Sequence, residues 1–201
     1  MINTMKKSLV LAAAVAALSA IAVPSMASAA NWGPLNTYHT LTSPSSITFN
    51  IQGTSPAVAI SCSSGPRFTA QVRTPASPLM DMTSTSTLSC TGTGGVFAGC
   101  NVPMALNGLP LWNADGTSGT SNVKINSVNI DVTFSSCAMN GAWTISGTLA
   151  GGVWSNLTRS LAFTNGTGLT FASPGTPYTY PVTVTASEFI KDTSSPFVSL
   201  N

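Results

Sequence analysis

The sequence predicts an all-β protein: an antiparallel β-sandwich or barrel-like domain of about nine to eleven short strands, after a cleaved N-terminal signal helix. Three observations support this fold class. Beyond the N-terminal segment, apolar residues recur at every second position, and turn-forming residues separate these runs at short intervals. No later segment has the i, i+3, i+4, i+7 apolar pattern of an amphipathic helix.

The N-terminal segment has the three parts of a secretory signal peptide. Lys6–Lys7 is the basic region, Leu9–Val23 is the apolar region, and Ala27–Ala29 is a small-residue cleavage site. The apolar stretch is shorter than the ~20 residues that a membrane-spanning helix needs. We therefore expect residues 1–29 to be removed and residues 30–201 to form a single all-β domain without a transmembrane anchor. The expected location is secreted or associated with the cell surface, with the periplasm as an alternative.

The clearest strands alternate apolar residues with Thr, Ser or Asn, which is typical of a strand with one buried and one solvated face. Six prolines lie between Pro34 and Pro78. Because proline cannot donate a backbone hydrogen bond, we expect the segments of this half to be edge strands and extended loops. In chain order, the expected strands are Ile47–Ile51, Ala57–Cys62, Phe68–Arg73, Thr85–Cys90, Asn122–Ser127, Val128–Ser135, Trp143–Leu149, Leu161–Phe163, Leu169–Phe171, Pro181–Ala186 and Phe197–Leu200.

Turn residues indicate how these strands connect. Asn140-Gly141 and Asn165-Gly166 each separate two apolar runs, and Asn-Gly is the strongest short signal for a hairpin turn. The stretch Arg73–Thr87 combines two prolines with a Ser/Thr run, so we expect a long surface loop there.

Beyond the signal peptide the chain is almost uncharged. Residues 30–201 contain five Lys or Arg and five Asp or Glu, so ten of 172 side chains carry a charge and the net charge is zero. An ordinary soluble domain has about 25% charged residues. Nucleic-acid binding is not expected, because it needs clustered cations. A surface without charge repulsion instead favours self-association or adsorption.

Four cysteines, Cys62, Cys90, Cys100 and Cys137, are expected to form two disulfides in an exported chain. Three pairings are possible, and their spacing alone does not choose between them. A short Gly-rich loop closed by Cys90 and Cys100 would leave Cys62 to join Cys137. A zinc site is a weaker alternative, because the cysteines are not closely paired and the only histidine lies far away in sequence.

Catalytic residues are scarce, so we expect no enzyme and no cofactor. His39 is the sole imidazole and is interpreted as an exposed or edge-strand residue. Paired carboxylates could hydrolyse a glycoside, and Asp81, Asp115 and Asp131 are the candidates. Each has a structural interpretation instead: a loop, a turn and the polar face of a strand, respectively.

Tryptophans offer a second kind of site, because exposed aromatic rings on β-proteins stack against sugar rings. Trp143 shares a face with Ile145 and Leu149, so we expect it in the core. Trp112 and Trp154 lie next to turns and are the candidates for ligand stacking. A carbohydrate-binding β-sandwich module is therefore the alternative function.

The run Cys100–Trp112, with its Cys, Pro, Gly-Leu-Pro and Trp, resembles a segment of the small exported bacterial proteins called PraB, or alkane oxidation activator proteins. The strand that ends at Cys137 and the following Asn140–Trp143 continue the resemblance, which covers about Ile60–Leu149. The chain departs from the family in having Cys90 and no cysteine after Cys137, so no disulfide pairing is carried over, and no catalytic residue is either.

The resemblance implies an exported accessory protein that acts at hydrophobic interfaces or in biofilm. Together with the low charge, it leads us to expect a non-enzymatic protein of the cell surface or extracellular matrix. Self-assembly by edge-to-edge addition of strands is a further expectation.

Overall fold

The computed structural model describes residues 32–34, 36–63, 67–72, 79–84, 87–108, 110–115, 120–138 and 140–200. The predicted signal peptide lies outside these residues. The described part contains strands and one 3-10 turn, η1 (Gly95–Phe97), and no α-helix. The strands are β1 (Trp32–Gly33), β2 (Tyr38–Thr42), β3 (Ile47–Ile51), β4 (Val58–Cys62), β5 (Arg67–Gln71), β6 (Leu79–Ser84), β7 (Leu88–Thr93), β8 (Asn101–Leu106), β9 (Leu111–Asp115), β10 (Thr120–Phe134), β11 (Gly141–Ser155), β12 (Ser160–Ala172), β13 (Thr179–Asp192) and β14 (Ser199–Leu200).

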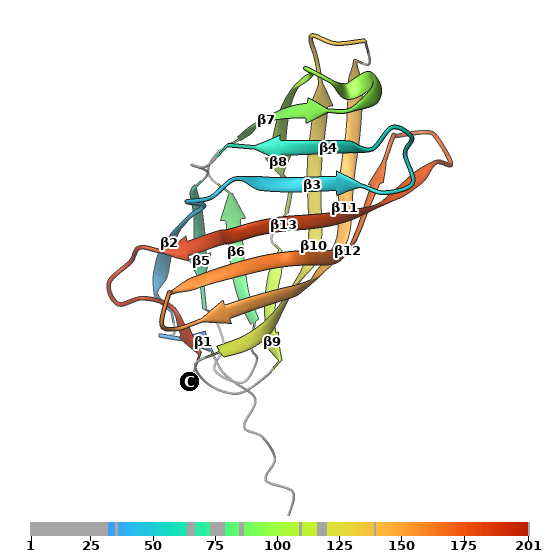
Figure 1. The fold of residues 1–201 in the computed structure, drawn as a ribbon. Coiled ribbons are helices and arrows are strands. Elements are labelled where there is room, and N and C mark those ends of the chain that lie inside the picture. The colour runs from blue at the N-terminus through green and yellow to red at the C-terminus, as the bar shows by residue number, and fades with distance from the viewer. Residues whose placement is uncertain are drawn as a thin grey trace, which may run out of the picture.

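Twelve strands form one antiparallel sheet that closes on itself into a barrel (Figure 1). The chain passes up and down the barrel wall eight times, and we call each passage a course. The first four are each split in two, as β2 and β3, β4 and β5, β6 and β7, and β8 and β9. The last four, β10 to β13, are unbroken and have 13 to 15 residues. Each course pairs with the next, and β13 returns to pair with both β2 and β3. The all-β antiparallel prediction is confirmed.

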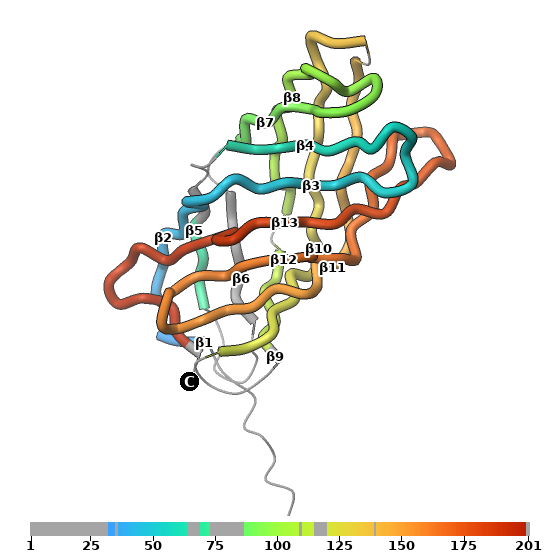
Figure 2. The backbone as a smooth tube through the Cα atoms, in the orientation of Figure 1, coloured from blue at the N-terminus to red at the C-terminus, as the bar shows by residue number. Residues whose placement is uncertain are grey.

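Splitting of the first four courses explains why the fourteen observed strands exceed the expected number. Pro44 lies between β2 and β3, and Pro110 lies between β8 and β9. A proline interrupts the hydrogen-bond ladder because it has no N–H group. The prediction of edge strands in this half is wrong, since β3, for example, pairs with β4 on one side and β13 on the other. Pro44 therefore lies between two strands that are both paired, and the tube changes direction between β2 and β3 (Figure 2).

Two turn predictions have different outcomes. Asn140-Gly141 does lie where β10 turns into β11, as predicted. Asn165-Gly166 does not form a turn but lies within β12, where Gly166 is opposite Val184. A Cβ atom at Gly166 would lie 2.7 Å from the Phe163 side chain and 2.8 Å from the Leu149 side chain, so any larger residue would displace them and glycine favours close packing there. The predicted loop Arg73–Thr87 is wrong in part, because it contains β6, which pairs with β5 and β9.

Apolar side chains fill the barrel. One aromatic group packs towards the end that carries the turns 52–57, 94–100 and 173–178 and the end of β10, which we call the upper end. There Trp143 stacks on Phe171 with ring centroids 4.6 Å apart, but it is partly buried and packs against the core instead of lying within it as predicted. A second aromatic group lies at the opposite, lower end, with β1 and β14. An apolar cavity of about 40 Å³ lies beside core residues such as Phe49, Ile125 and Leu149.

Candidate functional site

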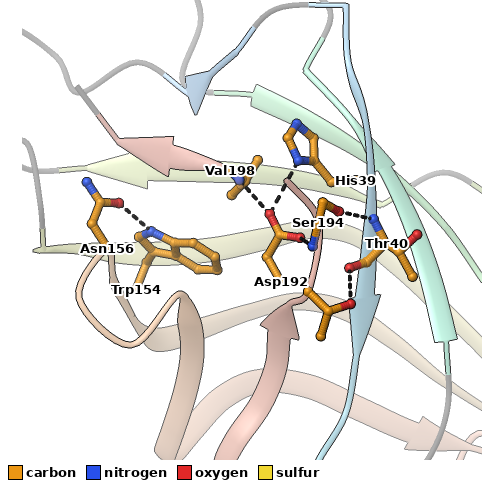
Figure 3. Close-up of polar contacts among 8 residues, drawn as sticks. His39, Thr40, Trp154, Asn156, Asp192, Ser194 and Val198 are labelled. Carbon is orange, nitrogen blue, oxygen red and sulfur yellow. Dashed lines mark hydrogen bonds and ion pairs between the residues drawn. The ribbon is translucent and has the colours of Figure 1, made fainter. Parts of the chain in front are cut away.

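A buried imidazole and carboxylate form the most polar group inside the described barrel. His39 on β2 and Asp192 at the end of β13 are 0% and 2% exposed. The Nδ1 atom of His39 lies 3.3 Å from Oδ2 of Asp192 (Figure 3). The prediction of an exposed or edge-strand histidine is wrong. β2 pairs with β5 and β13, and His39 shares the inward face with Leu41.

Asp192 also holds the chain that follows β13. Its Oδ1 atom accepts a hydrogen bond of 2.8 Å from the Ser194 N–H, and Oδ2 accepts one from the Val198 N–H. Burial raises the pKa of Asp192, but the adjacent His39 imidazole and the hydrogen bonds from Val198 and Ser194 outweigh it and lower the pKa from 3.8 to about 2. The carboxylate is therefore ionised at neutral pH. It anchors residues 193–198 across the lower end of the barrel.

This pair lacks the other parts of a nucleophilic site in the part of the chain that the structure describes. Ser194 is the nearby hydroxyl, but its Oγ atom accepts a 2.7 Å hydrogen bond from the Thr40 N–H (Figure 3). The Nε2 atom of His39 has no hydrogen-bond partner among the described residues. Because His39 is fully buried, no substrate can reach that nitrogen without local opening. The geometry is that of a structural connection between β2, β13 and the C-terminal segment.

Of the three candidate acids, only Asp131 has a side chain that the structure describes. Asp131 is exposed on β10, as predicted, and Oδ2 accepts a hydrogen bond from Nδ2 of Asn107. The backbone of Asp115 ends β9 instead of forming a turn. The side chains of Asp81 and Asp115 lie outside the described residues. Within the described residues, no group of three or more His, Cys, Asp or Glu side chains is placed to hold a metal ion.

The prediction that Trp112 and Trp154 stack against a ligand is wrong. Both side chains are 0% exposed, and they pack with Trp32 of β1 in edge-to-face contacts with ring centroids 5.4 to 6.5 Å apart. Trp154 donates a 2.8 Å hydrogen bond to Oδ1 of Asn156 (Figure 3). Nearby turns did not expose these rings, because Trp112 and Trp154 occupy inward positions of their strands. The three tryptophans close the lower end of the barrel.

Two disulfides form, as predicted, but their pairing differs from the one considered from the short loop. Cys62 joins Cys90, and Cys100 joins Cys137. Cys62 on β4 is directly opposite Cys90 on β7, with Cα atoms 3.9 Å apart. Cys100 precedes β8, where a bridge between Asn101 and Ser135 brings the end of β10 close to it. Strand order therefore selects the pairing.

The outer wall carries few charges. Among the side chains that the structure describes, only five charged ones reach the solvent: Lys124, Asp131, Arg159, Glu188 and Lys191. Glu188 and Lys191 pair with each other at 3.5 Å, and the Arg159 guanidinium lies 4.2 Å from the ring centroid of Phe197. Local partners thus offset much of the little charge that is present.

Large apolar side chains are exposed near both ends of the barrel. Leu157 is 92% exposed in the turn between β11 and β12, and Tyr38 is 69% exposed where β2 begins. At the upper end, Tyr178 and Val96 are 67% and 53% exposed. These residues add apolar contact area to a wall made mainly of Ser, Thr and Asn.

Comparisons of this chain with protein-family models, with curated proteins and with solved structures find no match. Among the described residues, no helix has the length and apolar character that crossing a membrane requires. Sequence reasoning missed the His39–Asp192 pair, because the two residues are 153 positions apart and neither carries a local motif.

Proposed function

We propose that this protein is an exported, non-enzymatic component of the cell surface or extracellular matrix that adsorbs at hydrophobic interfaces. One observation carries the proposal: the described outer wall has only five solvent-exposed charges and presents Ser, Thr and Asn instead. Moving a charge away from water costs far more than moving a hydroxyl group. A barrel with so few charges therefore has a smaller desolvation cost at an apolar surface than one with an ordinarily charged wall.

Two further features support this proposal. Both disulfides suit an oxidising location outside the cytoplasm, in agreement with the predicted signal peptide. The resemblance to PraB-like proteins points to the same environment, since it implies an accessory role at hydrophobic interfaces or in biofilm. Exposed Leu157, Tyr38 and Tyr178 provide apolar side chains that can enter the interface first.

Self-association is part of the proposal, but strand edges are not its route. The expectation of free edges is wrong for the twelve-stranded sheet, in which each of the eight courses pairs on both sides. Closure of a sheet removes the edges that would template another strand. Copies of the protein would instead meet through their uncharged walls and through the apolar residues at the two ends.

Adsorption tests the proposal directly. Mature protein is mixed with dispersed hexadecane, and the fraction that leaves the aqueous phase is measured together with the interfacial tension. The comparison is a variant with Thr148→Lys, Thr167→Glu and Thr185→Lys, three exposed positions of the outer wall. We expect the parent to adsorb and the charged variant to adsorb at least about tenfold less, because its added charges must be desolvated.

A second control separates charge from exposed apolar area. Leu157→Ser removes the most exposed apolar side chain without adding charge, and a smaller loss of adsorption is expected. Equal adsorption of the parent and the triply charged variant, or a parent that stays in the aqueous phase, would contradict the proposal. Immunogold microscopy of the native protein on cells tests its location.

A further inference from the structure

An uncharged polar groove crosses the outer wall of the upper half of the barrel. It has a volume of about 450 Å³ and lies between the β3–β4 turn and the strands β7, β12 and β13. Its polar lining consists of Asn50, Gln52, Thr54, Thr93, Asn165, Thr183 and Thr185. Gly53, Ala57 and Ala59 add small apolar patches. The volume is within the range of about 300–1,000 Å³ that is usual for ligand pockets.

The hydroxyl groups of the groove are oriented by bonds to neighbouring strands. Thr93 Oγ1 donates to the Ala59 carbonyl at 3.2 Å, and Thr185 Oγ1 donates to the Thr164 carbonyl at 3.3 Å. A hydroxyl has one hydrogen to donate, so both oxygens keep their lone pairs as acceptors for a ligand. Thr183 differs, because its Oγ1 accepts a 3.2 Å hydrogen bond from Nε2 of Gln52. The Thr183 hydrogen therefore stays available for donation.

The side-chain amides of Asn50 and Asn165 are further polar groups of the groove that can bind a ligand. The side chains of Asn50 and Asn165 make no hydrogen bond with another described residue, so their oxygen and NH₂ groups are available. An amide places a donor and an acceptor side by side. Together with the hydroxyls, these residues offer donors and acceptors along one groove, and no charged residue belongs to its described lining.

We propose that this groove binds a neutral glycan. Sugar hydroxyls each donate and accept hydrogen bonds, which matches the mixed lining, and the apolar face of a sugar ring fits against Gly53, Ala57 and Ala59. An anionic ligand, such as a uronic acid or a phosphate, would lack the Arg or Lys partners that such groups use. This binding does not depend on adsorption at hydrophobic interfaces, and either activity can exist without the other.

A peptide is the less suitable occupant. Extended peptides gain affinity by adding to an exposed sheet edge. Strands β3, β4 and β13 around the groove already pair on both sides, so no edge is available there. The lining also lacks a deep apolar pocket that would receive a peptide side chain. Without a tryptophan to stack on a sugar, the groove depends on its hydrogen bonds.

NMR titration of ¹⁵N-labelled mature protein tests the proposal, because the side-chain NH₂ signals of Asn50, Gln52 and Asn165 report on the groove itself. The probes are cellopentaose, maltopentaose and a mannopentaose. A trigalacturonate and a neutral Ser-Thr-Gly peptide are the comparison ligands. We expect at least one neutral oligosaccharide to shift these signals saturably, with both comparison ligands at least about tenfold weaker.

Substitutions locate the site. Asn50→Ala with Asn165→Ala is expected to weaken binding at least about tenfold, whereas Asn129→Ala, at an exposed outward position of β10, is expected to leave it unchanged. The unfolding free energy of each variant is measured to show that the barrel is retained. Absence of saturable shifts with all three oligosaccharides overturns the proposal. Equal binding of the anionic sugar or the peptide does so too, as does equal binding by the double variant.

Discussion

The buried Asp192 carboxylate predicts how the stability of the protein depends on pH. Its pKa is 3.8 before folding and about 2 in the folded barrel. Since one pKa unit corresponds to about 1.36 kcal/mol, the ionised group stabilises the folded state by about 2 kcal/mol. The folded pKa lies below the unfolded one, so this contribution is complete above about pH 5. It is lost as the pH falls through 3.8 towards 2, where the folded carboxylate is protonated.

The assay is urea unfolding of the mature protein at pH values from 7 to 2. We compare the parent with Asp192→Asn, which cannot ionise, and with His39→Ala, which removes one of the groups that lower the pKa. The free energy of unfolding of the parent should fall by about 2 kcal/mol more than that of Asp192→Asn between pH 5 and pH 2. His39→Ala should show a smaller acid-induced fall than the parent.

Glu188→Gln is the matched control, because Glu188 is a partly exposed carboxylate on the same strand. Its removal should leave the acid-induced fall nearly unchanged. Only five carboxylate side chains occur in residues 30–201, so few other groups can contribute to this pH range. Parallel pH curves for the parent and Asp192→Asn would show that the His39, Val198 and Ser194 contacts do not favour the ionised form of Asp192.

Three further predictions concern stability. Trp32→Ala should lower the unfolding free energy measured in urea by about 3–5 kcal/mol, because it leaves a cavity in the buried tryptophan cluster. A loss below about 1 kcal/mol would contradict that packing. Peptide mapping without reductant should find the disulfides Cys62–Cys90 and Cys100–Cys137. Replacing either pair by alanines should lower the unfolding free energy by about 3–4 kcal/mol, because the disulfides close loops of 28 and 37 residues. Gly94→Ala should be less stable than Gly53→Ala by about 1–3 kcal/mol. Both glycines have positive φ, but only at Gly94 would a Cβ atom clash with the Ala57 carbonyl oxygen. Equal thermal unfolding temperatures of the two variants would exclude that clash.

Local patterns predicted the strands well where the chain is regular. The alternation in Val128–Ser135 and Trp143–Leu149 led to β10 and β11, although both strands are longer than expected. The segments β2, β8 and β9 were missed, since their short runs contain prolines, small residues or a histidine with no clear period. The turn predicted at Asn165-Gly166 is wrong, because the sequence does not distinguish a glycine that allows close packing from a glycine that forms a turn.

The site was less predictable than the fold. Trp112 and Trp154 lie beside turns in the chain, yet their rings point into the barrel, since the face of a residue depends on its register within the sheet. The groove combines residues from five strands and one turn, and each of them alone is an ordinary surface Asn, Gln or Thr. The volume and the hydrogen bonds of the groove therefore cannot be predicted from a local sequence pattern.

The all-β class, the four cysteines for two disulfides and the near absence of charge follow from local pattern and residue counts, because a period of two and a count are local or additive properties. Closure of the sheet, the pairing of the cysteines and the burial of His39 against Asp192 depend instead on contacts between distant segments. Closure pairs residues from opposite ends of the chain, such as Thr48 with Thr185. This pairing depends on the register of every strand that lies between the two residues in the sequence, so it cannot be predicted from a short segment.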